Sequence, residues 1–150
     1  MTDSISSKDH FGFNFITLAR RWRKAIDREL ADSGLTDATW TPLIHLSKHG
    51  EPLTQSELAH LIGLDTSSLV RLLDQLEAKG MLERQIDPKD RRARLLNLTD
   101  QGRQEVAKLS IQLTNIEHHL LSGISEDDVA NLMNSFDLIS QNAQSILDRP

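Results

Sequence analysis

Residues 53–80 read LTQSELAHLIGLDTSSLVRLLDQLEAKG, and this stretch decides the fold. Thr54 and Glu57 have the spacing of a capping box, in which hydroxyl and carboxylate each accept a backbone N–H at the start of a helix. Apolar residues then follow at helical spacing until Gly63 ends the helix. Asp65 is a favourable N-cap for a second helix with its own apolar stripe. Two short helices joined through a glycine-containing turn predict a helix-turn-helix, whose second helix enters the major groove of DNA.

The second helix would expose small hydroxyl side chains at its start and one arginine, Arg71, further along. The hydroxyls allow close approach to phosphates and bases, aided by the positive end of the helix dipole. Arg71 could bind a guanine with two hydrogen bonds, a contact worth about 1–3 kcal/mol of discrimination. An arginine that only solvates the helix surface is the alternative. The residues expected on this DNA-facing surface are Thr54, Gln55, Thr66, Ser67, Ser68, Arg71 and Gln75.

A hairpin follows the two helices. Residues 82–86 and 94–98 carry apolar residues in alternation and flank a turn-rich, basic tip. Residues 84–94 contain five basic and two acidic side chains, in a chain whose net charge is −5. A basic wing beside a recognition helix can reach the neighbouring minor groove or its phosphates, although a solvated turn is the alternative. The wing residues expected at DNA are Arg84, Lys89, Asp90, Arg91, Arg92 and Arg94.

These segments resemble the MarR family of bacterial regulators, particularly its SlyA-like branch. The resemblance covers nearly the whole chain and is carried by residues 18–23, 35–40, 53–59, 68–81, 90–94 and 98–99. It implies a mainly α fold with a small β-hairpin wing, in which a winged helix-turn-helix domain is flanked by N- and C-terminal dimerisation helices. It also implies a homodimeric repressor or activator of transcription. In the family pattern Asp90 braces an arginine that enters the minor groove, and Arg92 matches that arginine best.

Helices are expected on both sides of this lobe. Residues 11–30 and 37–48 have helical periodicity, with Thr36 as a cap, and two further helices are expected between Thr99 and the end of the chain. We therefore predict one domain over residues 1–150, with a DNA-binding lobe at about 53–98 and a dimerisation frame at about 11–48 and 99–150. Spacings of three and four residues after Thr99 form a heptad-like seam that requires a partner helix. The predicted dimer contacts are Val106, Leu109, Leu113, Ile116, Leu120, Phe136, Ile139 and Ile146.

The frame would set two recognition helices about one DNA turn apart, on pseudo-palindromic double-stranded DNA. An effector, a small aromatic carboxylate or phenol as the family resemblance implies, would release the DNA by changing that spacing. Its crevice should lie where the frame meets the lobe. Plain core or interface packing of both tryptophans is the alternative. The residues that could line the crevice are Trp22, Trp40, Ile44 and His45.

Composition narrows the function classes. The 150 residues are 38% hydrophobic and 26% charged, contain no cysteine, and include no apolar run long enough to cross a membrane. Disulfides and cysteine-based sensing are therefore excluded within this chain. The polar start is not a signal peptide, so a cytoplasmic location without membrane contact is expected. The negative net charge does not exclude DNA, because residues 71–94 carry +2 and residues 95–150 carry −5.

Two other classes of function compete with DNA binding. The chain has no G-x-S-x-G motif, phosphate-binding glycine loop or cysteine nucleophile, so we expect no catalytic residues. His45 and His49 have the spacing of zinc ligands, but two histidines without further ligands do not complete a site, and neither metal nor cofactor is expected. A winged-helix module that acts only through protein–protein contacts is the remaining alternative, although it would not need so many arginines.

Overall fold

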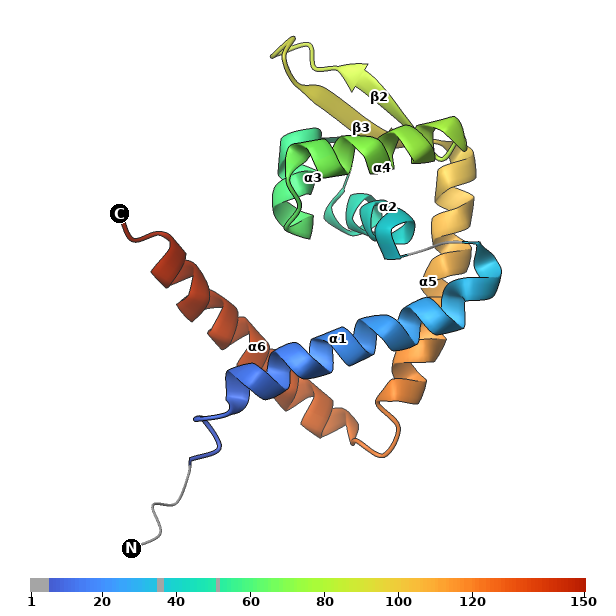
Figure 1. Cartoon of the computed structure of the whole chain (residues 1–150). Helices are drawn as coiled ribbons and strands as arrows, with labels where there is room; N and C mark the ends of the chain where they lie inside the picture. Colours follow the sequence, from blue (N-terminus) through green and yellow to red (C-terminus); the bar gives the residue numbers. More distant parts are fainter. Residues whose placement is uncertain (1–5, 35–36, 51) are drawn as a thin grey trace, which may run out of the picture. The chain divides into compact units, whose positions relative to one another are not determined.

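The computed structural model of the chain describes residues 6–34, 37–50 and 52–150. It forms two compact units, Met1–Ile116 and Glu117–Pro150. The predicted cap Thr36 lies outside the described residues. In chain order the elements are α1 (Phe11–Leu30), η1 (Ala31–Ser33), α2 (Asp37–His49), β1 (Leu53–Thr54), α3 (Gln55–Ile62), α4 (Thr66–Ala78), β2 (Leu82–Ile86), β3 (Arg94–Leu98), α5 (Asp100–Leu120) and α6 (Glu126–Leu147) (Figure 1).

The predicted helix-turn-helix is confirmed in α3 and α4. The N–H of Glu57 donates to the Thr54 hydroxyl at 3.1 Å, and the N–H of Thr54 donates to the Glu57 carboxylate at 2.7 Å, so the capping box is complete. Gly63 ends α3 at a φ of 76°, a left-handed conformation that glycine adopts without strain. Asp65 caps α4 by accepting the N–H of Ser68 at 2.8 Å. Local hydrogen bonds therefore fix both ends of the turn.

The wing is the predicted hairpin with one additional strand. β2 and β3 are antiparallel, with Leu82 opposite Leu98, and β1 pairs with β3, giving the order β1-β3-β2. A two-residue strand is too short to show alternation, so β1 had no sequence signal. The alternating pattern includes Ile86, but this side chain is 58% exposed, because it lies at the end of the hairpin next to the turn.

The core of the first unit is built from leucines of α2, α3, α4, the sheet and α5. Three of the predicted dimer contacts, Val106, Leu109 and Leu113, are buried in this core within a single chain. Burial of each such side chain contributes roughly 1.5–3 kcal/mol. The first half of the predicted seam is therefore intrachain packing, and the assignment of these three residues to a dimer interface is corrected. Ile116 and Leu120, further along α5, are half-buried.

A close joint connects the end of α4 to the start of α5. The Thr99 hydroxyl donates to the Gly80 carbonyl at 2.5 Å, the Thr99 N–H donates to the Met81 carbonyl at 3.1 Å, and the Gly102 N–H donates to the Thr99 hydroxyl at 3.0 Å. A Cβ on Gly102 would lie 1.8 Å from the Met81 carbonyl oxygen. Only glycine fits there, and we refer to Gly80, Met81, Thr99 and Gly102 as the α4–α5 joint.

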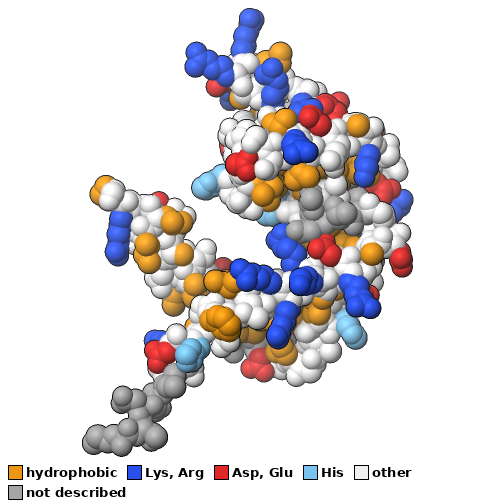
Figure 2. Space-filling model, in the orientation of Figure 1, with side chains coloured by type: hydrophobic (Ala, Val, Ile, Leu, Met, Phe, Trp, Pro, Cys, Tyr) orange, Lys and Arg blue, Asp and Glu red, His pale blue; other side chains and the backbone are white. Residues whose placement is uncertain are grey.

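The second unit consists mainly of α6. Ser125 caps it by accepting the N–H of Asp128 at 3.1 Å, and three acidic residues occupy its first turn, where the helix dipole favours negative charge. Phe136, Ile139 and Ile146 are exposed at spacings that place them on one side of the helix. Figure 2 shows hydrophobic side chains at the surface of this helix. Within the described ranges, no helix is long and apolar enough to span a lipid bilayer.

Candidate nucleic-acid interface

The first turn of α4 exposes three hydroxyl side chains, as predicted. Thr66, Ser67 and Ser68 are all exposed. The Ser67 hydroxyl donates to Asp65 Oδ1 at 2.6 Å and the Ser68 hydroxyl donates to Asp65 Oδ2 at 2.7 Å. The Ser67 hydroxyl, followed by the N–H and hydroxyl of Ser68, holds the pKa of Asp65 well below its ordinary value of 3.8. The turn therefore combines hydroxyls with an ionised carboxylate.

Arg71 and Gln75 follow on successive turns of the same helix. Both are exposed, and the spacing of four residues from Ser67 places them along one face. Over the part of the chain that is described, the guanidinium of Arg71 has no hydrogen bond or ion pair. It can therefore offer its paired donors to another molecule without breaking an internal contact.

The wing tip carries cations on a well-formed turn. Asp90 Oδ1 accepts the N–H of Arg92 at 3.0 Å, and Asp87 Oδ1 accepts the N–H of Lys89 at 2.8 Å. The guanidinium of Arg94 donates to the Arg91 carbonyl at 3.2 Å. Asp90 thus shapes the turn through the backbone of Arg92 instead of bracing a guanidinium. Figure 2 shows basic side chains projecting from the tip of the hairpin.

Arg84, also predicted to contact DNA, has a different environment. Its Nη2 lies 2.5 Å from both Asp74 Oδ1 and Glu77 Oε2, and only 21% of its side chain is exposed. The hydrogen bond from Arg84 lowers the pKa of Glu77. Since both carboxylates belong to α4, Arg84 connects β2 to the recognition helix. The structure places it as a brace, with its charge compensated.

A hollow of about 400 Å³ is lined by side chains of α3, α4 and the wing. It brings Gln55, at the start of α3, beside Arg92 and Arg94 of the wing. The buried Oε1 of Gln55 has no hydrogen-bond partner among the described residues. Thr54, in contrast, is occupied by the capping box. The remaining residues that line this hollow are Val70, Arg84 and Ile86.

A second hollow, of about 370 Å³, lies among α1, α2 and the helix-turn-helix. The predicted ligand residues do not line it: Ile44 is buried, and Trp22, Trp40 and His45 are half-buried. Arg23 and Thr41 line it instead, each directly after a predicted tryptophan on the same helix. The other lining residues are Ile62, Leu64, Ser68, Arg71, Leu72 and Gln75.

The histidine pair on α2 is stacked. The ring centroids of His45 and His49 are 5.5 Å apart, with an angle of 5° between the rings. Burial, followed by the nearby charges of His49, Lys48 and Arg23, lowers the pKa of His45 below its ordinary value of 6.5. Among residues 6–34, 37–50 and 52–150, no group of three or more His, Asp or Glu side chains could hold a metal ion.

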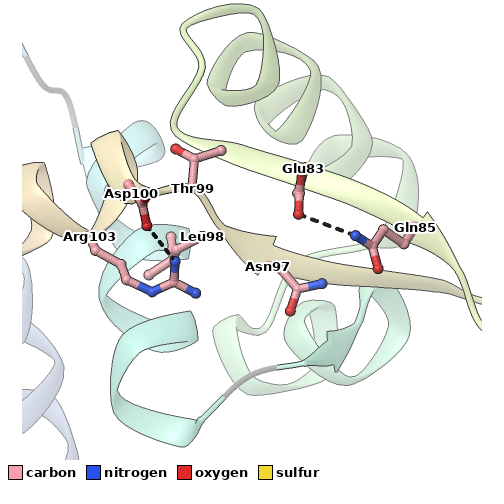
Figure 3. Close-up of a pocket in the computed structure, with 7 residues that line it drawn as sticks. All are labelled: Glu83, Gln85, Asn97, Leu98, Thr99, Asp100 and Arg103. Carbon is pink, nitrogen blue, oxygen red and sulfur yellow. Dashed lines mark hydrogen bonds and ion pairs between the residues drawn. The ribbon is translucent and has the colours of Figure 1, made fainter.

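The face of the hairpin opposite α4 is polar and includes acidic side chains. Glu83, Gln85, Asp100 and Arg103 are among the residues that line a polar hollow of about 470 Å³, with Asp100 and Arg103 paired at 3.5 Å (Figure 3). Glu83 and Gln85 alternate along β2 with Arg84, which faces α4. Glu83 and Asp100 make this face less favourable for phosphates than the basic face of α4 and the wing.

A helix-turn-helix with an exposed arginine, next to a basic hairpin, defines the class of winged-helix DNA-binding proteins. The comparisons with known proteins agree. A family model described as "MarR family" matches residues 33–93. The transcriptional regulator PA3341 is 33% identical, with a TM-score of 0.82, and the match covers 90% of this chain and 98% of that one.

Two solved structures of the repressor CouR are also similar. CouR bound to a 23-mer DNA duplex is 27% identical, with a TM-score of 0.77, over 86% of this chain and 91% of that one. CouR from Rhodococcus jostii RHA1 bound to p-coumaroyl-CoA is 26% identical, with a TM-score of 0.76, over 91% of this chain and 95% of that one. This chain belongs to the MarR family and is a DNA-binding transcriptional regulator; its assignment to the SlyA-like branch stays a prediction.

Proposed function

We propose that the chain acts as a homodimer that binds a pseudo-palindromic duplex sequence-specifically and is released by a small aromatic carboxylate or phenol. One observation carries the DNA-binding part of this proposal. Arg71 on α4 and Arg91 and Arg92 on the wing are exposed cations whose side chains have no hydrogen bond or ion pair among the described residues. They lie on the two elements that border one hollow of the lobe, in a chain that is acidic as a whole.

The geometry supports different roles in DNA binding for the two basic elements, α4 and the wing. The first turns of α4 would lie in the major groove, where Arg71 can bind a guanine. Arg91 and Arg92 would reach the adjacent minor groove, whose negative potential favours arginine. The brace from Arg84 to Asp74 and Glu77 would hold the wing at a fixed distance from α4. The hollow beside Gln55 leaves room for the sugar–phosphate strand that separates the two grooves.

Dimerisation is supported by the apolar side chains that one chain leaves exposed. An amphipathic helix gains most of its stability when its apolar face is covered, and α6 exposes such a face in the single chain. We propose that α6 and the end of α5 contact the partner subunit. The proposed contacts are Ile116, Leu120, Phe136, Ile139 and Ile146.

The part of the proposal that concerns the effector is based on the hollow lined by Arg23 and Arg71. Its volume of about 370 Å³ suits a single aromatic ring with a carboxylate. Arg23 would bind the carboxylate, and the apolar side chains of Ile62, Leu64 and Leu72 would pack on the ring. A ligand that contacts both α1 and α4 can favour an arrangement in which α4 no longer fits the groove, which is the condition for release. The complex of CouR with p-coumaroyl-CoA, which carries a phenolic ring, supports an aromatic ring in the ligand.

The experiment for DNA binding compares salt dependence between variants. Anisotropy of a labelled duplex is titrated with the full chain, with the double variant R91A/R92A, and with K108A, an exposed control on α5. We expect the double variant to bind more weakly and the slope of log Kd against log salt to fall by about one unit per lost phosphate contact per chain. Unchanged affinity and slope would overturn the wing's role, and no binding by the wild type at any salt would favour a protein-only module.

The experiment for release adds benzoate or phenol to the protein–DNA complex. We expect one of them to dissociate the complex from the wild type and from R28Q, a control on the same helix outside the hollow. R23Q should require a severalfold higher concentration of benzoate, because the carboxylate loses its cation. Equal release from R23Q and R28Q would show that the hollow is not the site.

A further inference from the structure

The first turn of α4 fixes the direction of two exposed hydroxyl hydrogens. Ser67 Oγ lies 2.6 Å from Asp65 Oδ1, and Ser68 Oγ lies 2.7 Å from Asp65 Oδ2. A carboxylate that has lost its proton can only accept hydrogen bonds, so both hydroxyls must be the donors. The same interactions keep the pKa of Asp65 well below its ordinary range, which keeps the carboxylate ionised near neutral pH.

Because both hydroxyl hydrogens are donated to Asp65, the serines are limited in what else they can bind. A serine hydroxyl has one hydrogen and two lone pairs, so each of these oxygens presents only lone pairs to a partner outside the chain. Such an oxygen cannot donate to a phosphate, to guanine O6 or N7, or to thymine O4. It can accept from an amino group, and in the major groove adenine N6 and cytosine N4 carry the amino groups.

We infer that Ser67 and Ser68 read base amino groups, on adenine or cytosine, and that Asp65 is the positioning residue that sets this preference. The inference rests on the proposed DNA-binding function and adds to it the chemistry of the bases read. Small hydroxyls at the start of a helix commonly bind phosphates. Here the negative charge of Asp65 lies 2.6 to 2.7 Å from both hydroxyl oxygens and disfavours a phosphate at that position.

Arg71 complements the serines, because a guanidinium has donors only. It lies four residues after Ser67, about 6 Å along the helix axis. One turn of α4 therefore reads amino groups and the next reads acceptors such as guanine O6 and N7. A half-site should accordingly contain an adenine or cytosine amino group within a few base pairs of a guanine.

The first test removes single amino groups from DNA. Sequences bound by the full wild-type chain are selected from random duplexes, and S67A and S68A identify the bases whose preference depends on each serine. Those bases are then replaced by purine for adenine or 2-pyrimidinone for cytosine, which lack only the amino group. We expect the wild type to bind the replaced duplex about 2- to 10-fold more weakly, and the matching serine variant to bind both duplexes equally. Equal binding by the wild type would overturn the inference.

The second test changes one serine from a hydrogen-bond acceptor toward DNA into a hydrogen-bond donor. Asparagine is as good an N-cap as aspartate, so D65N should retain α4 and its melting temperature. In D65N the amide oxygen would stay where Asp65 Oδ1 accepts both the Ser68 N–H and the Ser67 hydroxyl. The new NH2 group would then replace Oδ2 and donate to Ser68, turning the Ser68 hydrogen outward.

D65N should therefore change the base preferred at the Ser68 position from adenine or cytosine to guanine or thymine, and leave the Ser67 position unchanged. The double variant D65N/S68A should lose the new preference. A D65N selection identical to that of the wild type would overturn the inference. So would a loss of affinity in S67A and S68A that is the same on every duplex, because it would indicate phosphate contacts.

These outcomes separate the inference from the function on which it rests. If the wild type enriches no sequence at all, sequence-specific DNA binding itself fails. If it enriches a site whose serine-dependent bases lack amino groups, only the role assigned to Asp65, Ser67 and Ser68 fails.

Discussion

Two arginines of the lobe, Arg71 and Arg84, lie in opposite electrostatic settings. Arg84 is held between Asp74 and Glu77, whereas Arg71 is exposed on the recognition helix without a bound carboxylate among the described residues. An arginine that is already paired gains little from a phosphate or a base. The surroundings, and not the residue type, therefore make Arg84 a link between β2 and α4 and support the proposed base recognition by Arg71.

Replacing Arg71 tests that assignment. R71A should lose discrimination at one or two base pairs of each half-site, by roughly 1–3 kcal/mol, because no other side chain of that helix face can bind guanine with two donors from a guanidinium. R71K should retain general affinity but not the discrimination, since an ammonium lacks the planar pair of donors. Binding to the preferred duplex and to single-base variants measures this. If R71A weakened binding equally for all DNA sequences, base recognition by Arg71 would be contradicted.

His45 predicts a dependence of stability on pH. Burial, followed by the charges of His49, Lys48 and Arg23, lowers its pKa in the folded chain below the ordinary 6.5. The unfolded chain therefore binds the proton first, so stability is complete above pH 6.5 and falls as the pH drops toward the folded pKa. Urea unfolding at about pH 7.5 and about pH 5.5, on either side of that ordinary value, should show this loss in the wild type and in H60Q, an exposed control on α3, and a smaller loss in H45Q. The same loss in H45Q would assign it to another group.

At the scale of elements, the α4–α5 joint connects the end of the recognition helix to the start of α5. In G102A the new methyl group would meet the Met81 carbonyl oxygen at 1.8 Å, so backbone must move. We expect a loss of roughly 1–3 kcal/mol in the free energy of unfolding, as for other overpacked sites, and weaker DNA binding. Chemical denaturation and anisotropy measure the two effects.

G12A is the matched control for this substitution. A Cβ on Gly12 in α1 meets no atom within 4 Å, and alanine favours helix more than glycine does. It should therefore retain or slightly raise stability and leave DNA binding unchanged. If G102A behaved like G12A, the joint would not constrain α5.

Local signals explain why most elements could be predicted from the sequence. The caps Thr54, Asp65 and Ser125 lie within three residues of their partners, so the starts of these helices are visible in short motifs. The contact of Arg84 with Asp74 depends instead on how β2 packs against α4, which no local pattern contains.

Contacts between distant segments account for what the sequence did not predict. Heptad spacing in α5 indicates a buried side of the helix but not whether the partner is the same chain. Val106, Leu109 and Leu113 were therefore assigned to a dimer interface, although all three are buried within one chain. Arg23 and Thr41, which line the proposed effector hollow, were not predicted for the same reason, because they come together only through the packing of helices that lie apart in the sequence.

At the scale of the whole molecule, positive charge is concentrated in the segment that is proposed to contact DNA. The chain has a net charge of −5, yet residues 71–94 carry +2 and include the exposed arginines of α4 and the wing. For association with DNA the local field matters more than the net charge, because salt screens the field of an exposed charge beyond about 8 Å at physiological ionic strength. Acidic residues elsewhere in the chain therefore do not prevent binding.

The apolar side of α6 predicts the oligomeric state. I139K should convert the dimer into monomers or aggregates, because a charged side chain would be buried in the proposed interface. Q141K adds the same charge to an exposed position on the other side of α6 and should leave the dimer intact. Sedimentation at micromolar concentration distinguishes them. A normal dimer in I139K would mean that α6 does not contact the partner subunit.

The most direct measurement is selection of bound sequences from random duplexes by the full chain. Two α4 helices related by two-fold symmetry should enrich an inverted repeat with half-site centres about one DNA turn apart, roughly 34–36 Å. R71A should broaden the enriched sequence within each half-site. Enrichment of a single half-site, or of no sequence at all, would contradict the pairing of recognition helices on an acidic chain.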